Sequence, residues 1–218
     1  MALVVTVAVH AGDVEVKKNS SNAKRPRLEL EIKGDPVAGK AKLEAERCLE
    51  CHDQQGSELS QGAINKFATL SGQQADYIIK QVHDFREGKR RYDFMAMMAK
   101  SLTEQDLVDI ATYFGSQPKM QNDKGGENSR ASLLYDAGDA TRNIAACTSC
   151  HGKNGEGQKI GNIIYPAIAG QQWNYLDQQL RNWRSGERNN SVGNVMNNAA
   201  KLLTDEEIDL LSHYISGL

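Results

Sequence analysis

Two copies of one five-residue pattern decide the fold of this chain: Cys48-Leu49-Glu50-Cys51-His52 and Cys147-Thr148-Ser149-Cys150-His151. C-x-x-C-H is the attachment signature of c-type haem, in which both thiols bond the haem vinyl groups and the adjacent imidazole binds the iron. The alternatives are a zinc knuckle and a thioredoxin-like dithiol. Because the two copies use all 4 cysteines, we expect two covalently attached haems with His52 and His151 as iron ligands.

Length and composition limit what the chain can be. Its 218 residues allow two domains, and an aromatic content of 6% is low for two cores unless a large flat cofactor fills them. The formal net charge is −2, which haem propionates would make more negative. Nucleic acid is therefore not an expected partner. No run of apolar residues is long enough for a transmembrane segment.

The repeat extends well beyond the haem-attachment pattern. Leu70-Ser71-Gly72-Gln73-Gln74 matches Ile168-Ala169-Gly170-Gln171-Gln172. Phe85-Arg86-Glu87-Gly88 matches Trp183-Arg184-Ser185-Gly186. Tyr and Gln residues at matching places lie between these two segments. Two halves of the chain therefore share one fold.

Apolar spacing in each half predicts helices. One is expected at 73–87, another at 37–46, and a last helix begins after Thr103 in the first half and after Thr204 in the second. We expect an all-α protein with two repeated domains. The predicted parts are an extension at 1–33, a first domain at 34–117, a linker at 118–128 and a second domain at 129–218. The two domains are called the first and second half below.

The extension lies outside the repeat. Apolar residues alternate with other residues in Val5–Val9 and again in Leu28–Ile32, which predicts short β-strands. The alternative is the remnant of a leader peptide that ends at Ala11. Because two or three short strands are not stable alone and their edges can pair, we expect the extension to mediate a homo-oligomer or binding to a partner chain.

A c-type haem that only carries electrons needs a second axial ligand, and the methionine thioether is a common one. Met95 and Met196 each stand seven residues before the leucine that precedes the last helix of their half. The repeat therefore predicts Met95 and Met196 as iron ligands. Met97 and Met98 are expected to pack against the haem, with Met98 as the alternative ligand of the first half.

Four arginines lie at or just past the repeated helix: Arg86, Arg90, Arg184 and Arg188. They could neutralise the haem propionates. The alternative is that they are solvated cations at a helix end, where they interact with the helix dipole. The sequence favours neither interpretation.

The doubled pattern resembles the dihaem cytochrome c4 family. The second half carries the family motif most closely, in Ala169-Gly170-Gln171, Tyr175-Leu176, Gln179-Leu180 and Trp183-Arg184. The resemblance covers residues 34–218. It implies a tandem pair of class I cytochrome c domains related by a pseudo-twofold axis, with both haems near the interface. It also implies export to the periplasm, with membrane association only through a partner.

Two departures from the family pattern affect the first half. Asp53 follows the first C-x-x-C-H where the family has glycine, whereas Gly152 in the second half conforms. Ala68 stands where the second half has Pro166. The resemblance implies that the Pro166 carbonyl accepts the ring hydrogen of His151. The acceptor for His52 stays open, and a backbone carbonyl near Ala68 is one candidate.

The function predicted from these features is electron transfer between redox partners, a donor and a terminal oxidase or reductase of a respiratory chain. The protein is then not an enzyme. The alternative is a cytochrome subunit of a larger, flavocytochrome-like oxidoreductase. A haem enzyme such as a dihaem peroxidase is the third reading, but it needs an open coordination site, and Met95 and Met196 argue against one.

Overall fold

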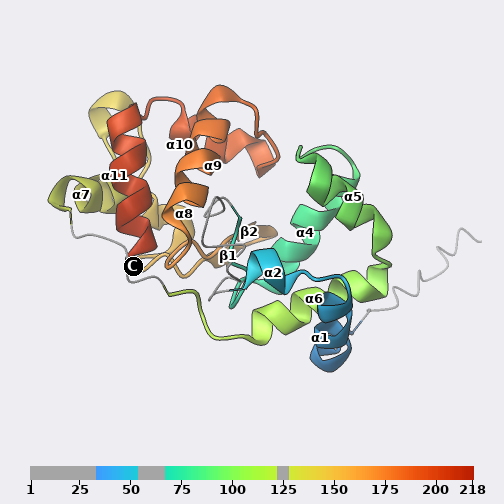
Figure 1. The fold of residues 1–218 in the computed structure, drawn as a ribbon. Coiled ribbons are helices and arrows are strands. Elements are labelled where there is room, and N and C mark those ends of the chain that lie inside the picture. The colour runs from blue at the N-terminus through green and yellow to red at the C-terminus, as the bar shows by residue number, and fades with distance from the viewer. Residues whose placement is uncertain (1–32, 54–66, 122–127) are drawn as a thin grey trace, which may run out of the picture. The chain divides into compact units, whose positions relative to one another are not determined.

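The computed structural model describes residues 33–53, 67–121 and 128–218, and these belong to one compact unit. The strands predicted at 5–9 and 28–32, and the assembly role given to the extension, lie outside the described residues. Figure 1 shows a largely helical chain. None of the described helices combines the length and apolarity needed to cross a bilayer.

The helices of the first half lie close to where the sequence predicts them. They are α1 (Pro36–Ala45), α2 (Leu49–His52), α4 (Ala75–Arg86), α5 (Asp93–Ser101) and α6 (Glu104–Ser116). The side chain of Asp35 accepts a hydrogen bond of 2.8 Å from the Val37 N–H, and Pro36 occupies the first helical position. Thr103 and Asp106 form a capping box that fixes the start of α6.

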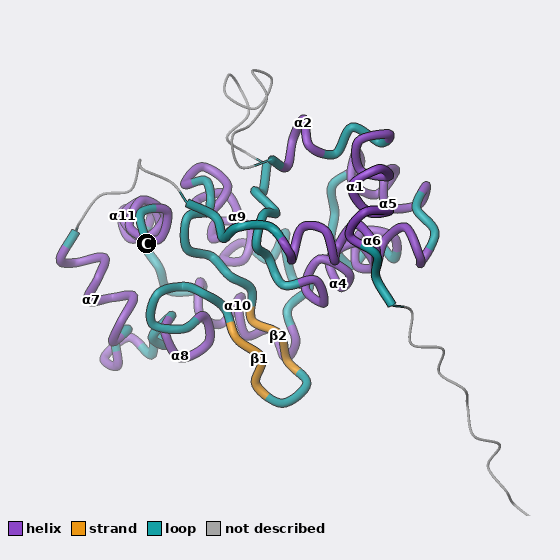
Figure 2. Tube along the Cα trace, turned by 90° about the horizontal axis from the view of Figure 1, so that it is seen from below, coloured by secondary structure: helices purple, strands orange, loops and turns teal. Residues whose placement is uncertain are grey.

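The second half follows the same order of helices, with short 3-10 turns and two short strands between them. Its elements are α7 (Ser129–Ala137), η1 (Ala140–Arg142), α8 (Thr148–His151), β1 (Gln158–Ile160), β2 (Ile163–Tyr165), α9 (Trp173–Ser185), η2 (Val192–Asn194), α10 (Val195–Ala200) and α11 (Asp205–Ser216). Strands β1 and β2 form an antiparallel hairpin in which Gln158 pairs with Tyr165, drawn in orange in Figure 2. The sequence analysis did not predict this hairpin. Thr204 and Glu207 cap α11 as predicted.

Each half has its own hydrophobic core. The first core includes Leu43, Ile78, Phe85 and Phe114, all from residues before 118. The second core includes Leu134, Tyr135, Trp183, Ile208 and Leu211, all from residues after 128. The predicted all-α fold of two tandem domains is thus confirmed, apart from the short hairpin.

Helices α1 and α6 pack against each other (Figure 1). Gly39 is buried at their contact, where a Cβ atom would lie 2.1 Å from the carbonyl oxygen of Asp109. Only glycine lets the two backbones approach this closely. This contact holds the N-terminal helix of the first half against its last helix.

Candidate functional site

Each haem-attachment sequence forms a single helical turn. The His52 N–H donates to the carbonyl of Cys48 at 3.0 Å, and the His151 N–H donates to Cys147 at 2.9 Å. A helical turn places residues three and four apart on one face. The two thiols and the imidazole of each sequence therefore share a side, as attachment at two vinyl groups and one iron requires. None of the 4 cysteines forms a disulfide, and all are partly buried.

The imidazoles are oriented by backbone carbonyls. Nδ1 of His151 lies 2.9 Å from the carbonyl oxygen of Pro166, and Nδ1 of His52 lies 2.7 Å from that of Ala68. A carbonyl only accepts, so the ring hydrogen sits on Nδ1 and Nε2 is left free to bind a metal. Burial lowers the pKa of both histidines, which keeps the rings neutral. Ala68 thus supplies the acceptor that the sequence left open.

One continuous cavity of about 380 Å³ joins the two halves. His52 and Met95 line it from the first half, and His151 and Met196 line it from the second, together with Cys147. Both methionines are partly buried and pack against the core of their own half. The structure therefore brings all four predicted iron ligands to a shared space.

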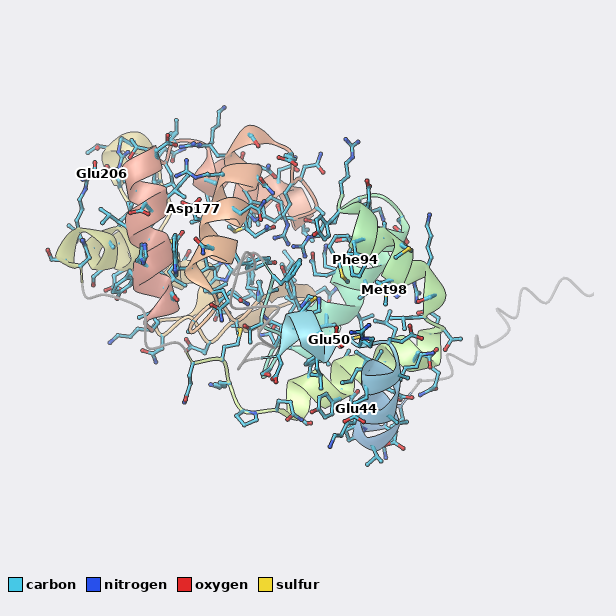
Figure 3. All side chains as sticks on the ribbon, in the orientation of Figure 1. Glu44, Glu50, Phe94, Met98, Asp177 and Glu206 are labelled. Carbon is cyan, nitrogen blue, oxygen red and sulfur yellow. The ribbon has the colours of Figure 1, made fainter. Side chains whose placement is uncertain are left out.

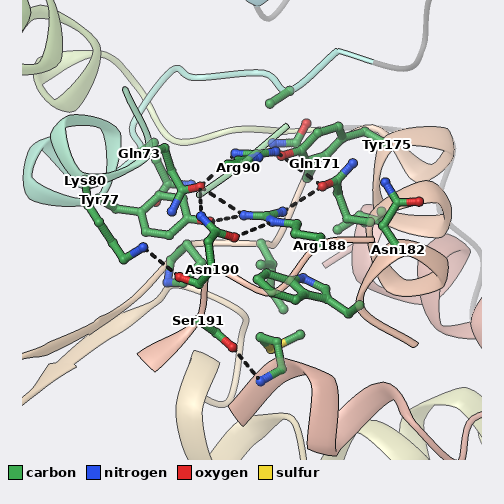
Figure 4. A pocket seen from close by; sticks show the side chains of 18 of the residues that line it. Gln73, Tyr77, Lys80, Arg90, Gln171, Tyr175, Asn182, Arg188, Asn190 and Ser191 are labelled. Atoms are coloured by element: carbon green, nitrogen blue, oxygen red, sulfur yellow. Dashed lines mark hydrogen bonds between the residues drawn. The ribbon is translucent and has the colours of Figure 1, made fainter. Parts of the chain in front are cut away.

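Polar side chains from both halves meet at this cavity (Figure 4). Arg90 donates to Gln81 of its own half at 2.9 Å and to Gln179 of the second half at 3.3 Å. Arg188 donates to Gln179 of its own half at 2.7 Å and to Gln81 of the first half at 3.1 Å. The two guanidinium groups thus share two glutamine carbonyls, one from each repeated helix.

This arrangement fits a haem carrying two propionates. Arg188 is only 6% exposed, and burial lowers its pKa. Within the described residues, the hydrogen bonds of Arg90 and Arg188 go to amide and hydroxyl oxygens and never to a carboxylate. Buried cations without an anion are unfavourable. Propionate carboxylates are anions of the kind these arginines lack.

A zinc site does not fit the same residues. Within the described ranges, no three His, Cys, Asp or Glu side chains come together as metal ligands. A zinc knuckle needs four such ligands around one ion. The two C-x-x-C-H sequences therefore do not combine into one metal site.

Comparison with known proteins agrees with this geometry. The sequence model of the cytochrome c family matches residues 36–118 and again residues 135–218. The chain is 36% identical to cytochrome c4 of Thiocapsa roseopersicina over 187 residues, which are 85% of this chain and 93% of the relative. The chain belongs to the cytochrome c4 family. It carries two covalently attached c-type haems and functions in electron transfer.

Two further relatives extend this result. The crystal structure of reduced recombinant cytochrome c4 from Pseudomonas stutzeri superposes with a TM-score of 0.72 at 31% identity, covering 85% of this chain and 99% of that one. The thiosulfate dehydrogenase electron acceptor of Stutzerimonas stutzeri is 31% identical over 184 residues, 83% of this chain and 82% of the relative. Both haem domains of this cytochrome thus have counterparts of known fold.

Two arginines predicted at the propionates lie elsewhere. Arg86 donates to the carbonyls of Ala99 at 2.6 Å and Leu102 at 2.7 Å, and it also pairs with Glu104. Arg184 donates to the Leu203 carbonyl at 2.8 Å and pairs with Asp205. Neither lines the cavity. They join the repeated helix to the start of the last helix of their half, and the propionate role considered for them stays a prediction.

The expectation for Met97 is wrong. Met97 is 58% exposed, on the outer face of α5, and neither Met97 nor Met98 lines the cavity. Figure 3 shows Met98 on α5 near Phe94, which is 53% exposed. The helical turn that directs Met95 inward directs Met97 to solvent, because residues two apart lie on nearly opposite sides of a helix.

Several residues of the interface were not predicted as functional. Tyr77, Gln81, Tyr175 and Gln179 join the arginines in the network, and Asn190 donates to Gln81 at 3.0 Å. The signal for four of them was present, since each tyrosine and glutamine recurs at the matching place of the other half. Asn190 has no such match, because Tyr92 occupies the equivalent position.

Proposed function

We propose that this protein is a periplasmic electron carrier in which His52 and Met95 ligate one iron and His151 and Met196 ligate the other. It passes electrons between redox proteins and catalyses no reaction of its own. The observation that carries this proposal is the placement of all four side chains around one cavity. With two protein ligands on each iron, no position is open to a substrate.

The residues of the chain suit a carrier. A c-type haem supplies a one-electron redox centre when bound. The carbonyls of Ala68 and Pro166 hold each proximal ring in one tautomer and orientation. Arg90 and Arg188 keep positive charge between the halves. Groups fixed in this way need little rearrangement when the charge at the iron changes.

Binding of carbon monoxide to the reduced protein tests the ligand assignment. A carrier with both iron positions filled should bind none, because the gas requires an open axial site. Met95→Ala and Met196→Ala should each open one site and bind about one equivalent. Stoichiometric binding of carbon monoxide by the native protein would instead support the haem-enzyme hypothesis and overturn the proposal.

A second candidate is a dedicated electron acceptor for one dehydrogenase. The relative from Stutzerimonas stutzeri, named as a thiosulfate dehydrogenase electron acceptor, favours this candidate. Stopped-flow reduction by a purified thiosulfate dehydrogenase with thiosulfate distinguishes the two. A dedicated acceptor is reduced at a rate that saturates at low cytochrome concentration, whereas a general carrier is reduced slowly there and rapidly by other donors. Size exclusion of the native protein, with identification of co-eluting chains, tests a stable complex.

A further inference from the structure

Two glutamine side chains cross between the halves and bind backbone in the opposite half. Gln171 Nε2 donates to the carbonyl of Thr69 at 2.9 Å, and Gln171 Oε1 accepts from the Thr69 N–H at 2.8 Å. Gln73 does the same in reverse. Its Nε2 donates to the carbonyl of Ala167 at 2.8 Å, and its Oε1 accepts from the Ala167 N–H at 3.0 Å.

These contacts fall on the peptide units that bind the proximal histidines. The Thr69 N–H and the Ala68 C=O belong to one planar peptide group, and that C=O accepts from His52. The Ala167 N–H and the Pro166 C=O form the equivalent group for His151. In each case a chain of hydrogen bonds runs from the imidazole, through one peptide, to a glutamine of the other half.

Burial strengthens this chain. Thr69 is 3% exposed, and Gln73 and Gln171 are each 4% exposed, so water does not compete for the bonds. Hydrogen bonds in series polarise one another, more strongly where the local dielectric is low. When the peptide N–H donates to glutamine, the carbonyl of the same peptide therefore becomes a better acceptor for the imidazole Nδ1–H.

We propose that Gln171 and Gln73 are crossed positioning residues: each sets the hydrogen bond of the proximal histidine in the opposite half. This rests on the proposed roles of His52 and His151 as iron ligands. A stronger bond at Nδ1 makes the imidazole a more basic ligand and favours the ferric state. The reduction potential of each haem therefore depends on contact with the other half.

The test compares Gln171→Met and Gln73→Met, which keep side-chain length but remove both bonds. Each haem potential is followed separately by potentiometric titration with NMR assignment of the haem methyl signals. Gln171→Met should raise the potential of the His52 haem more than that of the His151 haem, and Gln73→Met should do the opposite. Gln105→Met is the matched control, since Gln105 bonds Asp109 within its own half. It should shift neither potential.

Equal shifts of both haems, or a larger shift in the half that carries the substitution, would overturn the inference. Gln171→Glu provides a second variant should the methionine variant not fold. Glutamate keeps an acceptor for the Thr69 N–H, so the His52 haem should stay at or below its native potential. A rise as large as in Gln171→Met would contradict the hydrogen-bond chain.

The charge-transfer band of methionine-ligated ferric iron is recorded in the same samples. Where the band is intact and the crossed shift is missing, only the glutamine inference fails. Where the native protein lacks the band, the proposed ligand set fails.

Discussion

Arg90 of the first half donates a hydrogen bond of 2.9 Å to the hydroxyl of Tyr175 in the second half. The relationship recurs in reverse, since Arg188 donates to the hydroxyl of Tyr77 at 3.1 Å. Each guanidinium also lies over the aromatic ring near the end of its own repeated helix, within 4.7 Å of the centroid. Each of the two arginine side chains thus joins the halves and places a positive charge between them.

Replacing Arg90 with Met should affect both redox and stability. Loss of a cation near the haems favours the ferric state, so the mean of the two reduction potentials should fall. Loss of the bonds to Gln81 and Tyr175 should lower the free energy of unfolding by about 2–3 kcal/mol. Arg90→Lys keeps the charge without the planar fork, so it should restore the potential more than the stability. Potentiometry and urea unfolding measure the two effects, and an unchanged potential in Arg90→Met would contradict the electrostatic role.

The axial methionines are tested by spectroscopy of the oxidised protein. Met95→Ala and Met196→Ala should each remove about half of the long-wavelength charge-transfer absorption, because each opens one of two sulfur-ligated irons. Met98→Leu is the matched control on α5 and should leave the band intact. A full band in Met95→Ala would transfer the ligand role to Met98.

Asp53 should make the two haems unequal. Its carboxylate follows the first haem-attachment sequence, whereas the second half has Gly152 there. A negative charge near the iron stabilises the more positive ferric form, which lowers the reduction potential. We expect two resolved redox steps with the first haem at the lower potential, and Asp53→Asn should bring them closer together. A native titration that fits one potential for both haems would refute this.

The close contact at Gly39 predicts a stability effect. Gly39→Ala places a methyl group 2.1 Å from the Asp109 carbonyl, so α1 and α6 must separate. Overpacking of this kind costs about 1–3 kcal/mol. Lys40→Ala, at an exposed position of the same helix, should change the free energy of unfolding by less than about 0.5 kcal/mol. Equal effects of the two substitutions in thermal unfolding would show that the contact is not tight.

Glu207 predicts how stability depends on pH. The hydrogen bond from Arg142 lowers the pKa of this carboxyl below its ordinary 4.5. A carboxyl with a lowered pKa stabilises the fold at pH values above its ordinary pKa. This stabilisation is lost as the pH falls through the pKa of the folded state. Glu207→Gln should therefore destabilise the second half at pH 7 and have a smaller effect at pH 3. Urea unfolding at the two pH values measures this, and a constant difference would contradict it.

The haem-attachment sequences, the helices and the placement of Met95 and Met196 at the cavity were predictable because each depends on short-range spacing that recurs in both halves. Met95 was distinguished from the neighbouring methionines only because its position matches that of Met196 in the other half. The hairpin was not predicted, although Gly161-Asn162 between the two strands is a two-residue turn signal. It was overlooked because the strands have only 3 residues each.

The arginines show where sequence reasoning ends. Arg86 and Arg90 are four residues apart and have the same charge, yet one binds the last-helix junction of its own half and the other faces the second half. A turn separates them, and its direction depends on packing between elements that are distant in sequence. The acceptor for His52 was open for the same reason. A carbonyl needs no particular side chain, so Ala68 carries no signal of its role.

The backbone after each haem-attachment sequence also differs. Gly152 has φ +85, in the region that favours glycine, whereas Asp53 has φ −74. The first half therefore tolerates an acidic side chain where the second half does not. This local difference explains how the chain departs from its family at one position without loss of the fold.

The crossed glutamines bear on how such a chain can evolve. A protein built from two similar halves could in principle lose one and survive as a smaller carrier. Here the N–H groups of Thr69 and Ala167 each donate to a glutamine of the opposite half. Deletion of either half would expose the Thr69 or Ala167 peptide to water, and the peptide that binds the remaining proximal histidine would lose its glutamine partner. After a duplication followed by such an exchange of partners, neither half is easily lost, since each half has become part of the other's interior.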